Sequence, residues 1–226
     1  MSISFVIPCY NEEKNINGTY NSLIKAIKKN KLKYEIIFIN DGSSDKSLYL
    51  LEKLKKKHNH IKVINNKKNK GLAYSFKVGS LKSKMKYVQF LPSDNTFPPS
   101  QLSKMIKNYD KNDLTLSYHY DERIFIRRFI SKFYTFLVNL LFGYSYKYYN
   151  GITIIKAKIL KKINFKSSSP FFMAEIILKA SDLNNLITFR KLYFEERKHG
   201  KSNIFNINSI YTCFKDMILF KIRHDG

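Results

Sequence analysis

The chain has 226 residues, 41 Lys and Arg against 17 Asp and Glu, a formal net charge of +24, and 44% hydrophobic residues. This apolar content is enough for one large core, since single α/β domains commonly reach roughly 200–250 residues, and it excludes disorder as the main state. Cys9 and Cys213 are the only cysteines, which excludes a disulfide scaffold and predicts a reducing, cytoplasmic setting. The most apolar stretch, 133–142, is half of the ~20 residues that a membrane span needs, so no spanning helix is predicted.

The positive excess predicts an anionic partner, which can be nucleic acid, a nucleotide or phosphate substrate, or an acidic membrane surface. Only six arginines are present, and recognition of bases and phosphates favours the arginine fork, so nucleic acid is the least favoured of these partners. The alternative for most of the lysines is an ordinary solvated surface.

The first hundred residues repeat a unit of strand, loop and helix. Apolar runs at 3–7, 34–39, 61–64 and 87–91 predict four strands, and helical spacing or helix-start chemistry follows them. This alternation predicts an α/β fold with an open, mostly parallel sheet and helices on both faces.

The second half continues as a mixture of strands and helices without a repeat or a Pro- and Gly-rich linker, so we expect a single domain over 1–226. Strands are expected at 113–120, 150–156 and 186–194, and helices at 124–142, 171–180 and 207–222. A charged loop, 195–202, precedes the closing helix.

Ligands of open parallel sheets bind beyond the carboxyl ends of the strands. The residues that the predicted strands deliver to this edge are Pro8, Tyr10, Asn11, Glu12, Asp41, Asn69, Gly71 and Asp94. Ordinary loop chemistry explains any one of them, but it does not explain polar and acidic groups in four successive loops. The pattern therefore predicts a site for a phosphorylated ligand.

These loop segments, taken in order, resemble the motifs of family 2 glycosyltransferases. The resemblance is carried by residues 5–12 (FVIPCYNE), 40–45 (NDGSSD), 69–71 (NKG) and 93–95 (SDN). It implies the GT-A fold, a nucleotide-sugar donor and a divalent metal, Mg²⁺ or Mn²⁺. It also implies a nucleotide-binding half at 1–97 and an acceptor-binding half at 98–226.

Later segments resemble one branch of that family, which contains dolichol-phosphate mannosyltransferase and bacterial polyprenyl-phosphate sugar transferases. They are residues 127–131 (RRFIS), 150–151 (NG), 172–175 (FMAE) and 197–202 (RKHGKS). With these, the resemblance covers almost the whole chain.

The chain departs from the family pattern at three places. The usual Asp-x-Asp after the fourth strand is Pro92-Ser93-Asp94 here, and the usual Asp-Asp-Gly-Ser begins Asn40-Asp41, so each motif keeps only its second acid. His119 stands where the lipid-phosphate branch usually has Arg, which puts one positive phosphate contact in doubt.

Transfer from a nucleotide sugar leaves charge on the departing diphosphate, and a cation must receive that charge. Mg²⁺ keeps several waters and needs only one or two carboxylates, so Asp94 is expected to be a catalytic residue and the metal anchor. The alternative is that Asp94 only caps the helix that Pro98 and Pro99 help to start.

The resemblance implies a nucleotide-sugar pocket lined by Pro8, Tyr10, Glu12, Asp41, Asn69, Gly71 and Lys201. In this pocket Tyr10 would lie near the base and Glu12 near the ribose, and Asp41 would accept a hydrogen bond from a base N–H. A glycine at position 71 would let the backbone approach the ligand without a Cβ. The alternative for these residues is turn and N-cap chemistry.

Two further residues are expected to act on the reaction itself. Arg197, with Lys201, would close over the donor diphosphate as a mobile clamp and stabilise the charge of the leaving group. Glu175 is the candidate general base if the acceptor is a hydroxyl, whereas a lipid phosphate is already ionised and needs no base. The alternative for Glu175 is an acid on a helix surface.

His119, Arg127 and Ser131 are the candidate acceptor-binding residues. Arg127 and Ser131 are four apart and project from one helical face, and in the lipid-phosphate branch a matching pair meets the acceptor phosphate. The alternative is an ordinary basic helix face. The helix 124–142 combines aromatic with basic residues, which favours the interface of an anionic leaflet, although an apolar stripe usually packs into the core.

The sequence therefore predicts an inverting glycosyltransferase that moves a sugar from a nucleotide-diphosphate sugar to a polyprenyl-phosphate or cell-envelope glycan acceptor. It would be cytoplasmic and peripheral at the inner face of the cell membrane. One alternative is a non-enzymatic protein that binds nucleic acid or anionic surfaces. Three acids at one edge, Glu12, Asp41 and Asp94, argue against such a phosphate-backbone binder. The other alternative is a degenerate transferase without activity.

Overall fold

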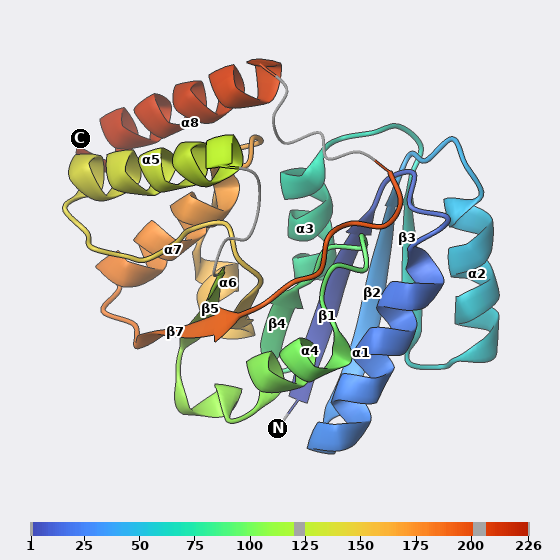
Figure 1. The fold of residues 1–226 in the computed structure, drawn as a ribbon. Coiled ribbons are helices and arrows are strands. Elements are labelled where there is room, and N and C mark those ends of the chain that lie inside the picture. Colours follow the sequence, from blue (N-terminus) through green and yellow to red (C-terminus); the bar gives the residue numbers. More distant parts are fainter. Residues whose placement is uncertain (1, 120–124, 201–206, 226) are drawn as a thin grey trace.

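The computed structural model describes residues 2–119, 125–200 and 207–225 (Figure 1). The strands are β1 (Ser2–Cys9), β2 (Lys33–Asp41), β3 (Ile61–Asn66), β4 (Tyr87–Phe90), β5 (Leu114–His119), β6 (Thr153–Lys156) and β7 (Ile187–Leu192). The α-helices are α1 (Ile16–Asn30), α2 (Ser47–Lys57), α3 (Leu72–Leu81), α4 (Pro99–Ile106), α5 (Phe125–Phe142), α6 (Ala157–Lys162), α7 (Phe172–Asp182) and α8 (Ile207–Asp225).

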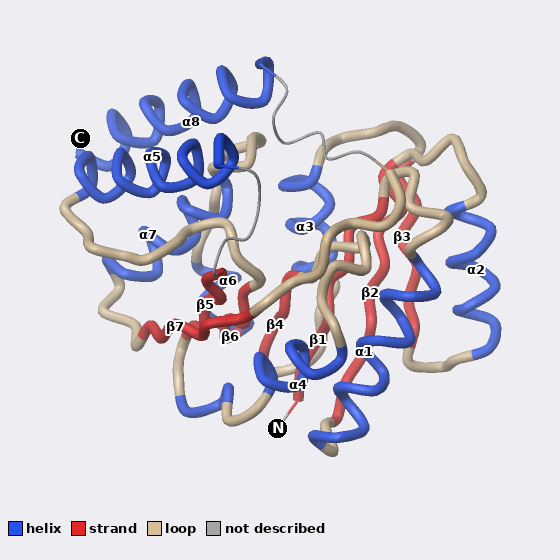
Figure 2. Tube along the Cα trace, viewed as in Figure 1, coloured by secondary structure: helices blue, strands red, loops and turns tan. Residues whose placement is uncertain are grey.

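The strands form one seven-stranded sheet in the order β3-β2-β1-β4-β6-β5-β7. β1, β2, β3 and β4 run parallel, whereas β6 pairs antiparallel with both β4 and β5, and β5 pairs parallel with β7. Helices lie on both sides of the strands (Figure 2). The predicted α/β fold, an open and mostly parallel sheet covered on both faces, is confirmed.

The alternation of apolar residues along β1 supplies both layers of the core, because successive side chains of a strand point to opposite faces. Ile3, Phe5 and Ile7 are buried with residues of α1, α2 and α4 on one face. Val6 is buried on the other face, with residues of α3, α6 and α7. β1, which ends in one of the polar loops, is therefore held between two packed layers.

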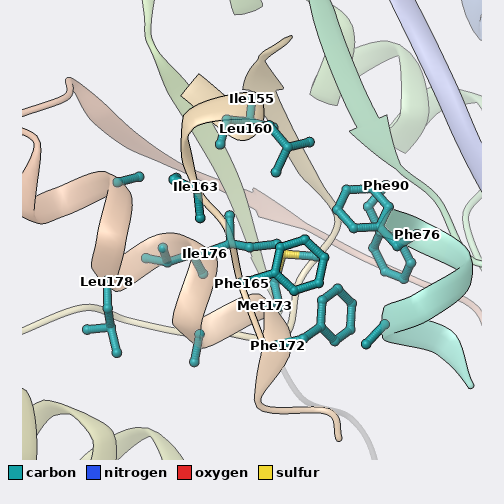
Figure 3. Close-up of a cluster of buried hydrophobic side chains, with 14 of the residues drawn as sticks. Phe76, Phe90, Ile155, Leu160, Ile163, Phe165, Phe172, Met173, Ile176 and Leu178 are labelled. Atoms are coloured by element: carbon teal, nitrogen blue, oxygen red, sulfur yellow. The ribbon is translucent and has the colours of Figure 1, made fainter. Parts of the chain in front are cut away.

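The core on the second face combines aliphatic side chains with several aromatic rings that contact one another (Figure 3). Phe76 of α3 and Phe90 of β4 lie edge to face with centroids 5.4 Å apart, and Phe172 of α7 contacts both rings. Such edge-to-face pairs contribute beyond their buried area. The start of α7 is thereby fixed against the middle of the sheet.

α5 and α8 join this layer through Phe142 and Phe220, and both of these rings contact Phe171. The two helices lie side by side (Figure 1). Among the described side chains of α5, four large apolar ones are exposed: Phe129, Phe133, Phe136 and Leu140. No helix among the described residues is long and apolar enough to cross a membrane.

The structure differs from the predicted elements at a few points. α6 was not predicted, because six residues are too few to show a helical period. The sixth strand begins at Thr153 rather than 150. Gly151, just before it, packs so closely on β5 that a Cβ there would lie 2.0 Å from the Ser117 carbonyl oxygen.

Candidate active site

The loops after β1 and β2 are joined by hydrogen bonds at the carboxyl edge of the sheet. The backbone N–H groups of Asn11, Glu12 and Glu13 donate to Ser43 Oγ at 3.0 Å, Ser47 Oγ at 2.9 Å and Asp45 Oδ2 at 3.1 Å, respectively. The side chains of Ser43, Asp45 and Ser47 therefore hold the backbone of the loop that carries Tyr10 and Glu12. Tyr10 itself is 42% exposed.

Asp41, at the end of β2, organises the loop after β3. Its buried carboxylate accepts hydrogen bonds from the backbone N–H groups of Lys70 at 3.0 Å and Gly71 at 2.8 Å, and from Asn66 Nδ2 at 2.8 Å. Gly71 has φ +88° and nothing within 4 Å of where a Cβ would lie, so a glycine is required here by backbone conformation rather than by crowding. Asp41 thereby brings Asn69 and Gly71 to the same edge.

Asp94 lies in a tight turn after β4. Its Oδ1 accepts from Thr96 Oγ1 at 2.9 Å and from the Thr96 backbone N–H at 3.3 Å. Ser93 Oγ donates to the Pro8 carbonyl oxygen at 2.8 Å, which joins this turn to β1. Asp94 is half-buried at the edge, as predicted from the sequence.

The segment that follows β7 also lies at the carboxyl edge of the first strands. The chain leaves β7 and crosses in front of β4 and β1 toward the loops after the first strands (Figure 1). On this path the Glu195 backbone N–H donates to the Thr96 carbonyl oxygen at 2.8 Å. Arg197 Nη2 then lies 2.7 Å from Glu12 Oε1, in an ion pair between the loop after β7 and the loop after β1.

Opposing charges surround the carboxylate of Glu12. Its burial raises its pKa above the ordinary value, and the nearby charge of Asp94 acts in the same direction, while Asn15 and Arg197 oppose the rise. The edge thus holds two acids near each other and one guanidinium, in a partly buried setting where charge interactions are stronger than in water.

The residues present fit a divalent cation that is held by a single protein carboxylate. The described residues contain no group of three or more His, Cys, Asp or Glu side chains placed to hold a metal. Both Glu12 oxygens already accept hydrogen bonds, and one oxygen of Asp94 is held by Thr96. Mg²⁺ commonly takes one or two carboxylates and completes its shell with waters and substrate phosphates, which suits Asp94.

Glu175 is not brought to this edge. It is fully buried in α7, where its carboxylate accepts from the backbone N–H groups of Lys166 and Ser167 and pairs with Lys179 Nζ at 2.8 Å. Burial raises the pKa of Glu175, but the bonds from Lys179, Ser167 and Lys166 outweigh it and hold the pKa below the ordinary value. The expected general base is therefore an anchor for the loop before α7, and the alternative of a surface acid is wrong as well.

Four of the remaining candidates lie in the second half of the chain. The backbone of His119 ends β5 and that of Arg127 lies in α5, but their side chains, like the whole of Lys201, are outside the described residues. Ser131 is half-buried on α5. Pro8 is buried in β1 and contributes its carbonyl oxygen to the bond with Ser93.

Sequence reasoning missed one residue that holds the edge together. Asn15, which is 3% exposed, bonds both Glu12 and the loop after β7. Asn15 directly precedes the helix α1, so its sequence position predicts only an N-cap residue. Its partner His199 is 184 residues away in the chain, and no local pattern reports such a bond.

The chain belongs to the family described as Glycosyl transferase family 2, which matches residues 4–169.

A curated relative is the poly-beta-1,6-N-acetyl-D-glucosamine synthase of Staphylococcus epidermidis, 33% identical over 110 residues, which are 49% of this chain and 26% of that one. The chain thus spans only part of the length of the curated relatives it matches.

Two solved structures share the fold. S. aureus TarS 1-349 in complex with UDP-GlcNAc has a TM-score of 0.62 and 22% identity, over 90% of this chain and 60% of that one. Glucosyl-3-phosphoglycerate synthase of Mycobacterium tuberculosis, in complex with Mn²⁺, UDP and phosphoglyceric acid, has a TM-score of 0.71 and 16% identity, over 96% and 78%.

Proposed function

We propose that this chain moves a sugar from a nucleoside-diphosphate sugar to a polyprenyl-phosphate or cell-envelope glycan acceptor, with inversion at the anomeric carbon. The observation that carries the proposal is the 2.7 Å ion pair between Arg197 and Glu12 at the edge that also holds Asp94. This pair places a cation where the first four strands deliver their loops. A departing diphosphate requires positive charge at such a point.

The donor would be held by the loops after β1 and β3. Tyr10 is exposed and offers a ring for the base. Glu12 is proposed to lie near the ribose, with its carboxylate held in place by Asn15 and Arg197. Asp41 supports the pocket by holding Asn69 and Gly71 in place, since its own oxygens already accept three hydrogen bonds. The solved relatives with UDP-GlcNAc or with UDP and Mn²⁺ make a nucleotide donor the natural choice.

Asp94 would hold Mg²⁺ or Mn²⁺. The bound cation would supply a Lewis acid for the diphosphate oxygens. Thr96 orients the Asp94 carboxylate through its hydroxyl, and Arg197 adds a second positive charge from the loop after β7. In the inverting step, an acceptor oxygen attacks the anomeric carbon from the face opposite the diphosphate, and the bond to the diphosphate oxygen breaks.

A phosphate acceptor suits this chain better than a hydroxyl acceptor. A hydroxyl needs a general base, and the carboxylate expected in that role, Glu175, is buried and fully bonded. A lipid phosphate is ionised at neutral pH and needs none. His119, Arg127 and Ser131 remain the residues proposed to meet it, which corresponds to the dolichol-phosphate mannosyltransferase-like branch.

A polyprenyl acceptor requires contact with a membrane. We propose that the exposed surface of α5 and α8 makes this contact, and that it binds the inner face of the cell membrane. α8 adds a stripe of exposed apolar side chains, Tyr211, Phe214, Ile218 and Ile222, to the stripe on α5. Lys132 and Lys215 are exposed on the same two helices. Apolar stripes with adjacent lysines suit an anionic leaflet.

A donor screen tests the proposal. Purified protein is incubated with UDP, GDP, CDP and dTDP sugars, with and without Mg²⁺ or Mn²⁺, and with a short-chain polyprenyl phosphate as acceptor. Transfer from one donor with metal dependence is the expected result. Nucleotide binding without transfer to any acceptor would support the degenerate transferase instead, and absence of nucleotide binding would overturn the proposal.

A further inference from the structure

We propose that Asn15 is a positioning residue for Arg197, which it holds at the donor site through a closed ring of hydrogen bonds. The inference rests on the proposed function, because that function assigns Arg197 to the donor diphosphate. Asn15 itself need not touch the substrate.

The ring has four members, and each is bonded to two others. Asn15 Nδ2 donates to Glu12 Oε2 at 2.7 Å and to the His199 carbonyl oxygen at 3.2 Å. Arg197 Nε donates to the same carbonyl oxygen at 2.6 Å, and Arg197 Nη2 donates to Glu12 Oε1 at 2.7 Å. The guanidinium is thus fixed in both position and plane.

Asparagine suits this place because its amide supplies two N–H donors without a charge. An aspartate would set a second carboxylate against Glu12 and against a carbonyl oxygen, and would donate to neither. The Asn15 backbone is itself fixed, since its N–H donates to the Glu12 carbonyl oxygen at 2.8 Å and its carbonyl oxygen accepts from Thr19 N at 2.9 Å. The start of α1 therefore serves as the rigid reference for the loop after β7.

Gly200 gives a second, independent sign that the loop is built around the guanidinium. Its φ is +80°, and a Cβ there would lie 2.6 Å from Arg197 Nη2 and 3.2 Å from Arg197 Cζ. The guanidinium folds back over this glycine, where no larger residue leaves room for it.

A pre-oriented guanidinium loses little freedom when charge develops on the leaving group, so the ring should matter more to turnover than to donor binding. When the ring of hydrogen bonds is lost, the Arg197 guanidinium stays charged and near the proposed donor site, but it is free to adopt other orientations. The expected signature is a lower kcat with a nearly unchanged KM for the donor.

The test compares Asn15→Ala with Asn30→Ala. Asn30 is a matched control on the same helix, because its amide also donates two hydrogen bonds, to the Ala26 carbonyl oxygen at 2.8 Å and to Ser103 Oγ at 2.9 Å. Melting temperatures of both variants are measured alongside kcat, donor KM and hydrogen exchange of the amides 198–200. Gly200→Ala is a third variant, which disturbs Arg197 without touching Asn15.

For Asn15→Ala we expect about a tenfold or greater loss of kcat, less than about threefold change in KM, and faster exchange at 198–200. Gly200→Ala should follow it, and Asn30→Ala should keep its kcat and its exchange at 198–200 even if it melts earlier. Unchanged exchange in Asn15→Ala, or faster exchange with unchanged kcat, overturns the inference. If the wild-type protein transfers no sugar at all, the proposed function fails, and the exchange data alone decide whether Asn15 holds the loop.

Discussion

The backbone N–H of Gly71 donates a hydrogen bond to Asp41 Oδ2 at 2.8 Å across 30 residues of chain. The Lys70 N–H donates to the other oxygen of the same carboxylate at 3.0 Å. One acid at the end of β2 therefore sets the conformation of the loop after β3. Asp41 is therefore a structural part of the proposed donor site.

Asp41→Ala should lower the free energy of unfolding by about 2–3 kcal/mol, because it leaves two backbone N–H groups and one amide without their buried acceptor. Donor affinity should fall with it, since Asn69 and Gly71 lose their support. Urea denaturation and nucleotide titration measure the two effects. Asp110→Ala is the control, because Asp110 is exposed, and its effect should stay within about 0.5 kcal/mol. A stable Asp41→Ala protein would contradict the anchoring role.

Asp94→Asn should abolish metal-dependent transfer while the fold stays intact. An asparagine keeps an oxygen that can accept from Thr96, so the turn survives and only the charge is lost. Because one carboxylate is a weak anchor, saturable Mn²⁺ binding by the wild type should require a nucleoside diphosphate. Isothermal titration with and without the nucleotide checks this. Near wild-type turnover in Asp94→Asn would remove Asp94 from the mechanism, and donor affinity unaffected by EDTA would point to a site served by Arg and Lys alone.

Arg197→Ala should lower turnover more than donor affinity, since its guanidinium acts on charge that develops as the diphosphate leaves. Lys198→Ala is the matched control, because Lys198 carries the same charge in the same segment and its side chain is 72% exposed. Steady-state kinetics of both variants separate kcat from KM. A pure loss of donor affinity in Arg197→Ala would make Arg197 a plain binding residue.

The kcat should fall at acidic pH because Glu12 becomes protonated. Burial raises the pKa of Glu12 above its ordinary value of 4.5, so Glu12 takes up a proton, and loses its ion pair with Arg197, at a pH above that value. A raised pKa means that the folded state binds this proton more readily than the unfolded state, so this protonation does not itself unfold the protein. The kcat should therefore fall before the melting temperature does. Glu12→Gln should show low turnover without this fall at acidic pH, and an activity loss that tracks the melting temperature would contradict the assignment.

The protein should co-sediment with anionic but not with neutral liposomes at low salt, and high salt should weaken the binding. Phe133→Glu with Phe136→Glu should reduce this binding without unfolding, because the two side chains are 47% and 57% exposed. Tyr49→Glu is the control, since Tyr49 is 66% exposed on α2, at the opposite side of the molecule from α5 (Figure 1). If the double variant unfolds, or if the wild type ignores anionic vesicles, α5 belongs to the core and the acceptor is brought in another way.

The sequence was a good guide wherever the signal was local. The apolar runs of the first four strands, the turn residues after them and the alternation with helices all predicted elements that the structure contains. The same signals brought Glu12, Asp41 and Asp94 to one edge, because the carboxyl ends of parallel strands share it.

What the sequence could not give are the bonds between distant segments. The segment FMAE, which contains Glu175, resembles a site motif. The Glu175 carboxylate nevertheless accepts hydrogen bonds from the backbone N–H groups of Lys166 and Ser167, and the periodicity of the sequence does not reveal these bonds. That Asp41 faces the base stays a prediction, and its bonds to Lys70 and Gly71 depend on the close approach of two loops. In each case a polar side chain was satisfied by backbone groups that only the assembled fold brings near.

The path of the chain after β7 also has a consequence for assembly. Glu12 follows the first strand, whereas Arg197 arrives from beyond an edge strand that is reached only through β4, β6 and β5. Pairings of such long sequence separation form late and slowly in folding. A chain caught with only its first four strands paired could present the nucleotide loops but not the guanidinium. With the proposed role of Arg197, turnover requires the complete sheet, and a newly made or damaged molecule would be inactive until its last strand has paired.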